Sequence, residues 1–220
     1  MIVTIDGPAG SGKSTAARGL SKRLGFEFLD TGAMYRCVAW GVLQRNVDPA
    51  DEQAVTDVSQ QVKITFADDQ VLLDGEDVSE AIRTPEVTEA ASVVAQYPTV
   101  RQELVRLQQQ AAAGVEIVSE GRDQGTVVFP DAFCKFFLIA DPEERARRRH
   151  EELAAKGKQV TLDAILQQIY ERDQRDEQRT VAPLKPADDA IEINTSRLAI
   201  NEVIDQLEQL VRSRISSDSP

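Results

Sequence analysis

The order of apolar and polar positions along the chain predicts a mixture of strands and helices. Five short apolar runs are rich in β-branched or aromatic residues, which is typical of buried strands. These runs lie at about residues 1–5, 26–29, 115–118, 133–140 and 191–193. Longer stretches of helix-forming residues lie at about residues 15–24, 31–45, 51–61, 84–97, 99–113, 141–155, 161–180 and 198–214. Strands and helices that alternate in this way indicate an α/β fold.

Capping residues mark the starts of several of these helices. One helix begins at Asp30 or Thr31, and two others begin at Thr84 and Asp141, each of which is followed by proline. Side-chain oxygens at these positions accept hydrogen bonds from first-turn N–H groups, and proline suits the first helical position. At the other end of the chain, we expect the tail 216–220 to be disordered.

Between residues 62 and 78 the pattern changes from helical to alternating. Residues 62–66 and 71–73 alternate between apolar and polar side chains, and turns are expected at 68–69 and 74–76. Such short strands joined by tight turns predict a small antiparallel meander. We expect this meander to be an insertion in the α/β pattern.

A glycine-rich turn joins the first predicted strand to the first predicted helix. Its sequence is Gly7-Pro8-Ala9-Gly10-Ser11-Gly12-Lys13-Ser14, which matches the pattern G-x-x-x-x-G-K-[ST]. The glycines let the main chain curl, so that successive N–H groups at the helix N-terminus point at one anion. Lys13 adds a positive charge at the β- and γ-phosphates, and Ser14 offers a hydroxyl to Mg²⁺. This stretch predicts a binding site for a nucleoside triphosphate.

The predicted helix at 161–180 carries an unusual stripe. Its apolar members are spaced as one helical face and are followed on that face by charged residues. The stripe consists of Leu162, Ile165, Ile169, Arg172, Asp176 and Arg179. A core-facing stripe that becomes charged indicates a polar cleft, and the alternative is an exposed, salt-bridged helix end.

Length and composition limit the classes of protein to consider. The 220 residues are enough for one domain with a sizeable core, and no apolar run reaches membrane-spanning length. Because a strand is expected from residue 1, we expect no signal peptide. Cys37 and Cys134 lack metal-ligand spacing and indicate a reducing cytosol. His150 is the only histidine, which disfavours Ser–His and His–metal enzymes.

The charge balance points to small ligands. A net charge of −12 argues against sequence-independent binding of nucleic acid. Among the 25 basic residues, 18 are arginine and 7 are lysine. Because the guanidinium group suits bidentate recognition of phosphate, this usage favours small phosphorylated ligands. Solvated surface positions remain the alternative for most of these arginines individually.

Taken in order, several segments resemble the bacterial cytidylate (CMP/dCMP) kinases. They are IDGPAGSGKST, LDTGAMYR, EDVSEAIRTPEV, EGRDQGTVVFPDA, ERDQRD and VAPL, and they run almost from end to end. The resemblance implies the nucleoside-monophosphate-kinase version of the P-loop α/β fold, with a five-stranded parallel sheet flanked by helices. It implies a single kinase domain over residues 1–220. The implied parts are a core at 1–61, 98–147 and 163–215, a small α/β monophosphate-binding insertion at about 62–97, and a lid at about 148–162.

The resemblance also assigns roles to individual residues. The residues implied to bind the donor are Gly7, Pro8, Ala9, Gly10, Ser11, Gly12, Lys13, Ser14, Thr15 and Arg145, with Ser14 as the metal ligand. The residues implied to act in catalysis are Lys13, Arg36, Arg122, Arg148, Arg149 and Arg179. The residues implied to bind the acceptor are Thr31, Tyr35, Arg36, Ser92, Arg101, Arg122, Asp123, Arg172, Asp176 and Arg179.

Within the acceptor set the resemblance implies three groups. Arg36, Arg122 and Arg179 are implied to hold the phosphate of the acceptor. Ser92, Arg101 and Asp123 are implied to read cytosine, and Arg172 and Asp176 are implied to lie near the sugar.

The activity implied is transfer of the γ-phosphoryl group of ATP, with Mg²⁺, to CMP or dCMP, which gives CDP or dCDP. We therefore expect small-molecule substrates, no nucleic-acid or membrane partner, and a monomer in the cytoplasm. No general base is required, because the attacking phosphate oxygen is already ionised near pH 7.

Other functions remain as alternatives. A kinase with UMP, AMP or a non-nucleotide acceptor fits the same phosphate loop, and so does a nucleotide-binding module without activity. A GTP-dependent switch is disfavoured, because neither N-K-x-D nor D-x-x-G occurs in the chain.

Overall fold

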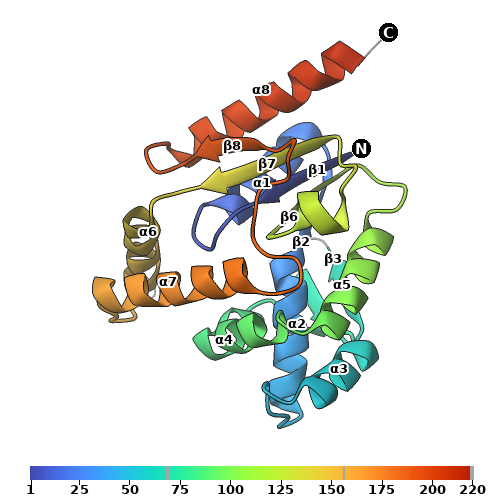
Figure 1. Cartoon of the computed structure of the whole chain (residues 1–220), viewed down its shortest axis with the longest axis vertical. Helices are drawn as coiled ribbons and strands as arrows, with labels where there is room; N and C mark the ends of the chain where they lie inside the picture. The colour runs from blue at the N-terminus through green and yellow to red at the C-terminus, as the bar shows by residue number, and fades with distance from the viewer. Residues whose placement is uncertain (68–69, 156, 219–220) are drawn as a thin grey trace. The chain divides into compact units, whose positions relative to one another are not determined.

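The computed structural model describes residues 1–67, 70–155 and 157–218, which form two compact units. The first unit comprises Met1–Leu29 and Ala112–Pro220, and the second comprises Asp30–Ala111. Figure 1 shows the elements of both units, which are described separately below. The expected insertion at 62–97 lies inside the second unit, and the expected lid at 148–162 lies inside the first.

The first unit is built on a five-stranded parallel sheet, as predicted (Figure 1). Its strands are β1 (Ile2–Asp6), β2 (Glu27–Asp30), β6 (Ile117–Gly121), β7 (Cys134–Ile139) and β8 (Ile191–Asn194), in the spatial order β2-β6-β1-β7-β8. The central strand β1 pairs in parallel with β6 and β7, so that Asp6 lies beside Gly121 and Phe137. The carboxyl ends of these strands therefore meet at one edge, where ligands bind in α/β folds.

Two helices pack on the sheet to form the main core. Helix α1 (Lys13–Leu24) and helix α8 (Ile200–Asp218) bury apolar side chains against β1, β6, β7 and β8. Gly19 makes their close approach possible, because a Cβ atom there would lie only 2.4 Å from Cδ1 of Ile204. The amphipathic pattern of α8 follows from this contact, since Leu207 and Val211 are completely buried.

A second apolar cluster joins helix α6 (Pro142–Ala155) to helix α7 (Leu162–Gln178). Ile165 and Ile169 of the predicted stripe are buried in this cluster. The prediction was wrong for Leu162, the first residue of α7, which is 45% exposed and is not part of this cluster.

The second unit combines helices with a small sheet. Its helices are α2 (Thr31–Gln44), α3 (Glu52–Gln61), α4 (Pro85–Val94) and α5 (Pro98–Ala111), with a 3₁₀ turn η1 (Ala81–Arg83). Its strands β3 (Ile64–Ala67), β4 (Gln70–Leu73) and β5 (Glu76–Asp77) form an antiparallel meander, which confirms that prediction. The turn expected at 68–69 lies outside the described residues. In Figure 1, α3, α4 and α5 surround α2 within this unit.

Several predicted boundaries are confirmed by their caps, and one is wrong. The Asp30 and Thr84 side chains accept the N–H groups of Ala33 and Val87 at the starts of α2 and α4. The disorder expected from Ser216 is wrong for residues 216–218, because α8 continues to Asp218. The Ser216 hydroxyl donates a hydrogen bond to the carbonyl oxygen of Arg212, one turn earlier in α8. Residues 219–220 of the expected tail lie outside the described residues.

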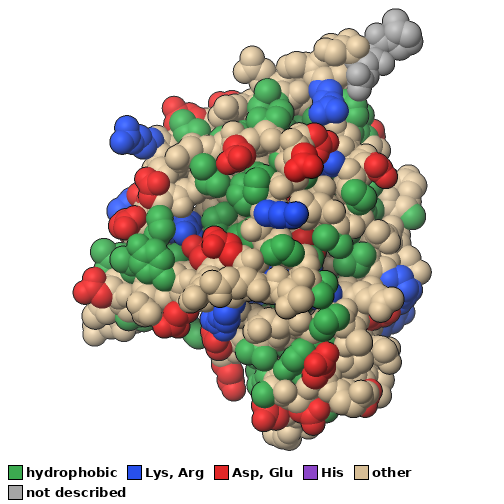
Figure 2. All heavy atoms as spheres, in the orientation of Figure 1, with side chains coloured by type: hydrophobic (Ala, Val, Ile, Leu, Met, Phe, Trp, Pro, Cys, Tyr) green, Lys and Arg blue, Asp and Glu red, His purple; other side chains and the backbone are tan. Residues whose placement is uncertain are grey.

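Surface properties agree with the acidic composition. On the face drawn in Figure 2, Lys and Arg side chains are dispersed among Asp and Glu side chains and form no large patch. Among the described residues, no helix combines the length and the apolar character that crossing a membrane requires.

Candidate active site

The phosphate loop lies between β1 and α1, at the edge of the sheet where the central strands end. Gly7, Gly10 and Gly12 have φ angles of 145°, 78° and 88°, a region that side chains with a Cβ atom rarely adopt. At Gly7 a Cβ atom would lie 2.1 Å from the carbonyl oxygen of Leu138 in β7. Sterics therefore require glycine here, and the loop curls as the sequence motif predicts. Gly12 directly precedes α1, so the positive end of that helix faces the loop.

Lys13 folds back over the loop that it belongs to. Its side chain is 4% exposed, and its Nζ atom donates to the carbonyl oxygen of Pro8 at 2.9 Å. Burial, together with the positive charge of Arg122, lowers the pKa of Lys13 to about 7. An anion bound in the loop would favour the charged ammonium group, so Lys13 is suited to bind phosphate.

Ser14 and Glu120 form a pair beside the loop. The Ser14 hydroxyl donates to Oε1 of Glu120 at 2.8 Å, and Glu120 is buried near the end of β6. Hydroxyl and carboxylate oxygens suit Mg²⁺, which proteins often hold with one or two groups plus substrate phosphates. Clusters of three or more His, Cys, Asp or Glu that could hold a metal are absent from the described residues. The pair fits Mg²⁺ in its chemistry.

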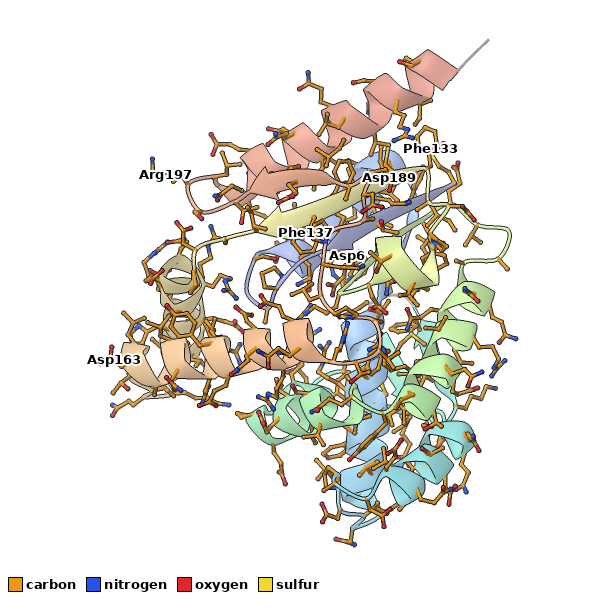
Figure 3. The ribbon with its side chains drawn as sticks, viewed as in Figure 1. Asp6, Phe133, Phe137, Asp163, Asp189 and Arg197 are labelled. Atoms are coloured by element: carbon orange, nitrogen blue, oxygen red, sulfur yellow. The ribbon has the colours of Figure 1, made fainter. Side chains whose placement is uncertain are left out.

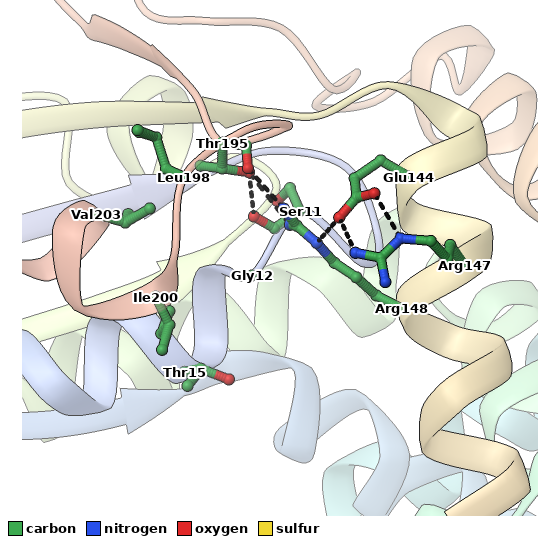
Figure 4. Close-up of a pocket in the computed structure, with 10 residues that line it drawn as sticks. All are labelled: Ser11, Gly12, Thr15, Glu144, Arg147, Arg148, Thr195, Leu198, Ile200 and Val203. Carbon is green, nitrogen blue, oxygen red and sulfur yellow. Dashed lines mark hydrogen bonds and ion pairs between the residues drawn. The ribbon is translucent and has the colours of Figure 1, made fainter.

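A cavity of about 270 Å³ adjoins the other side of the loop, as Figure 4 shows. Thr195, just after β8, donates its hydroxyl to the carbonyl oxygen of Ser11 at 3.0 Å. Arg148 crosses the cavity and donates to the Thr195 carbonyl oxygen at 2.6 Å and to Glu144 at 2.8 Å. The apolar part of the lining is Leu198, Ile200 and Val203. A second cavity, of about 320 Å³, is lined by the loop and by Arg145, Arg148 and Arg149.

Arg145, which lies on α6, links the phosphate loop to α7, and all three nitrogens of its guanidinium group donate hydrogen bonds. The side chain is 3% exposed, its Nε donates to the carbonyl oxygen of Ala140, and its Nη1 donates to that of Ala9. It also makes a bidentate ion pair with Asp173 of α7, at 3.0 and 2.6 Å. These bonds favour a bracing role, and direct contact of Arg145 with ATP stays a prediction.

The charged half of the α7 stripe is anchored inside the first unit. Arg122, just after β6, donates through Nε to Asp176 at 2.8 Å, and Asp176 is 9% exposed. Burial alone would raise the pKa of Asp176. The guanidinium groups of Arg122 and Arg172 outweigh that effect, so this pKa lies below its usual value. The alternative of an exposed, salt-bridged helix end is therefore wrong for exposure at Asp176, although the salt bridge with Arg122 is present. Asp123, which follows Arg122, is also buried.

The second unit holds the remaining predicted acceptor residues, of which Thr31 is buried in the first turn of α2. Arg36 pairs with Asp30 at 3.2 Å, and the guanidinium of Arg101 lies 5.6 Å from the centre of the Tyr35 ring. Arg101 is 3% exposed and donates to the carbonyl oxygen of Ala95.

Two buried polar atoms in this unit suggest a ligand. Among the described residues, Oγ of Ser92 and Nε of Arg36 are buried and have no hydrogen-bond partner. Buried polar atoms without partners are costly and commonly mark a place where a ligand or water binds.

Sequence reasoning missed Glu120 and Thr195. Glu120 has a recognisable signal, an acidic residue at the end of a predicted core strand. Thr195 has none, because its contact with Ser11 joins segments 184 residues apart.

Comparisons with known proteins agree with this arrangement. A family model described as cytidylate kinase matches residues 3–213. The cytidylate kinase of Rhodopirellula baltica is 46% identical over 219 residues, which cover 100% of this chain and 96% of the relative. That of Pelotomaculum thermopropionicum is 48% identical over 220 residues, which cover 98% and 96%. A shikimate kinase structure from Bacteroides thetaiotaomicron matches with a TM-score of 0.51 and 12% identity, covering 96% of this chain and 98% of that one. This last likeness concerns the fold alone.

The Arg145–Asp173 brace predicts a large loss of stability when one partner is removed. Asp173→Ala leaves the buried guanidinium group without its carboxylate, so the free energy of unfolding should fall by about 3 kcal/mol. Glu177→Ala, which removes an exposed acid from the same helix, should change it by less than about 0.5 kcal/mol. Urea unfolding followed by circular dichroism measures both, and equal effects would contradict the bracing role.

Proposed function

Because the chain belongs to the cytidylate kinase family, we propose that it transfers the γ-phosphoryl group of ATP to CMP or dCMP. The observation that carries the proposal is the phosphate loop with Lys13 folded over it. In the same unit, Arg122 lies just beyond the neighbouring strand β6. Phosphoryl transfer requires mainly positioning and stabilisation of charge, and these residues supply both.

The donor nucleotide binds along the loop. Backbone N–H groups of the loop and Lys13 hold the β- and γ-phosphates. The cavity beside Ser11 suits the adenine base, because Leu198, Ile200 and Val203 offer an apolar surface for a flat ring. Arg148 and Arg149 line the second cavity and would stabilise the charge that develops during transfer.

The donor binds together with Mg²⁺. Ser14 and Glu120 would hold the ion, which supplies positive charge to the oxygens of the β- and γ-phosphates. The hydrogen bond between these side chains keeps both oxygens close to the loop.

We propose roles for the predicted acceptor residues of each unit, taken separately. In the first unit, Arg122 and Arg179 bind the acceptor phosphate, and Arg172 and Asp176 contact the sugar. In the second unit, Arg36 binds the phosphate as well. No general base is needed, since the second ionisation of a phosphate monoester has a pKa of about 6.

Cytosine is selected by the donors and acceptors it meets. Its N3 and O2 atoms accept hydrogen bonds and its N4 amino group donates them, whereas uracil carries a donor at N3 and an acceptor at O4. Arg101 can only donate, so it suits N3 and O2, while side-chain oxygens of Ser92 and Asp123 can accept from N4. The unpartnered Oγ of Ser92 supports this assignment.

The remaining parts of the proposal concern the state of the protein. We propose a monomer in the cytoplasm, acting on small nucleotides. Cys37 and Cys134 are both buried and form no disulfide with each other, which fits a reducing compartment.

An acceptor screen tests the function. With ATP and Mg²⁺ in a coupled assay, CMP and dCMP should be phosphorylated much faster than UMP or AMP. Lys13→Ala should lower turnover at least about 10²-fold, because it removes charge from the transferring phosphates. Lys22→Ala, on the exposed face of the same helix, serves as the control and should keep full activity. A preference for another acceptor, or full activity of Lys13→Ala, would overturn the proposal.

The assignment of Arg101 makes a separate prediction. Arg101→Met should lower the ratio of kcat/KM for CMP to that for UMP at least about 10-fold, mainly by loss of CMP activity, because one buried hydrogen bond is worth about 1–3 kcal/mol. Arg106→Met is the matched control on α5, since Arg106 is 51% exposed and pairs with Glu103. An unchanged ratio in Arg101→Met would place base recognition elsewhere.

A further inference from the structure

Asp6 is a buried carboxylate that the proposed chemistry does not use. It is the last residue of β1 and directly precedes Gly7 of the phosphate loop. Its side chain is labelled in Figure 3. The residue is 4% exposed. Its position is therefore fixed by the central strand of the sheet on one side and by the loop on the other.

Both oxygens of Asp6 hold the segment that follows β6. Oδ1 accepts the backbone N–H of Gln124 at 2.9 Å, and Oδ2 accepts that of Gly125 at 2.7 Å. These two residues follow directly after Arg122 and Asp123, to which we assign binding of the acceptor. One side chain thus joins the start of the donor loop to the acceptor-binding segment.

Close packing leaves little freedom at either end of this clamp. A Cβ atom on Gly125 would lie 3.1 Å from Oγ1 of Thr4 and 3.2 Å from Cδ of Lys135. At the other end, Gly7 rests against the carbonyl oxygen of Leu138, as described above. The segment is therefore closely packed against Thr4 and Lys135 at the place where Asp6 holds it.

The chemistry of the clamp selects aspartate. A carboxylate offers two acceptor oxygens and can take two adjacent N–H groups, whereas asparagine would direct its own amino group at one of them. Burial raises the pKa of Asp6 to about 7, although the hydrogen bonds from Gly125 and Gln124 oppose this shift. An ionised group is costly at such a site, so its two bonds with the acceptor-binding segment are its main compensation.

We propose that Asp6 is a positioning residue that fixes Arg122 and Asp123 relative to the phosphate loop, so that the acceptor phosphate meets the γ-phosphoryl group in line. This role rests on the proposed function. It predicts that loss of the clamp harms transfer to CMP far more than binding of the donor. The donor loop keeps its own supports, which are Gly7 against β7 and Lys13 on Pro8.

The test compares Asp6→Asn with the wild-type protein in three measurements. They are kcat and KM for CMP, the Kd of ADP by calorimetry, and the slow hydrolysis of ATP without an acceptor. In Asp6→Asn, kcat/KM for CMP should fall about 10²-fold, the size expected for a misplacement of about 1 Å. The Kd of ADP and the rate of ATP hydrolysis should stay within about threefold of the wild-type values, because the donor loop is intact.

Two further variants complete the design. Asp205→Asn is the control, since it removes an exposed carboxylate charge that pairs with Arg23 outside the clamp and should leave all three measurements unchanged. Gly125→Ala tests the clamp from the other side, because its added Cβ atom would lie 3.1 Å from Oγ1 of Thr4 and requires the segment or that side chain to shift. It should show the same pattern as Asp6→Asn, and it keeps the test valid if Asp6→Asn does not fold.

The possible outcomes test the proposed function and the positioning role of Asp6 separately. Absence of CMP phosphorylation in the wild-type protein would overturn the proposed function itself. With an active wild-type protein, unchanged kcat/KM for CMP in folded Asp6→Asn or Gly125→Ala would overturn the positioning role. An equal loss of ADP affinity and CMP transfer would also overturn it, since that result would show that Asp6 only supports the donor loop.

Discussion

The close contact between Gly7 and the carbonyl oxygen of Leu138 is the constraint on which the site depends. Because no Cβ atom fits between β1 and β7 at this point, the chain leaves the sheet in a conformation that glycine alone adopts easily. The turn that follows delivers Lys13 and Ser14 to the first turn of α1. The proposed donor site is therefore a consequence of backbone geometry first and of side-chain chemistry second.

Charge is distributed differently inside the first unit than over the chain as a whole. The protein carries a net charge of −12, yet Lys13, Arg122 and Arg145 are directed inward at the loop and its neighbouring segments. Exposed arginines of α6 such as Arg147 pair with glutamates on their own helix, in pairs that contribute little to stability. An acidic overall composition and a cluster of inward-directed cationic side chains thus coexist in this protein.

Structural features that depend on neighbouring residues could be predicted from the sequence, whereas features that depend on distant residues could not. The phosphate loop, the helix start at Thr84 and the meander in the second unit were predictable, because a few adjacent residues determine each of them. Glu120 and Asp6 escaped prediction, since their partners Ser14 and Gly125 are more than 100 residues away. Leu162 was wrongly predicted to be buried, because helical periodicity gives the direction of a side chain but not whether another element covers it.

The central claim is that close packing at Gly7 shapes the loop that binds the donor phosphates. Calorimetric titration of ADP with Mg²⁺ into Gly7→Ala and Gly25→Ala tests it most directly. Both glycines have positive φ angles, but a Cβ atom on Gly25 would meet nothing within 4 Å, so only Gly7→Ala adds a clash. Folded Gly7→Ala should lose ADP affinity about 10²-fold, while Gly25→Ala should stay within about threefold of the wild-type protein. Wild-type affinity in folded Gly7→Ala would contradict the central claim.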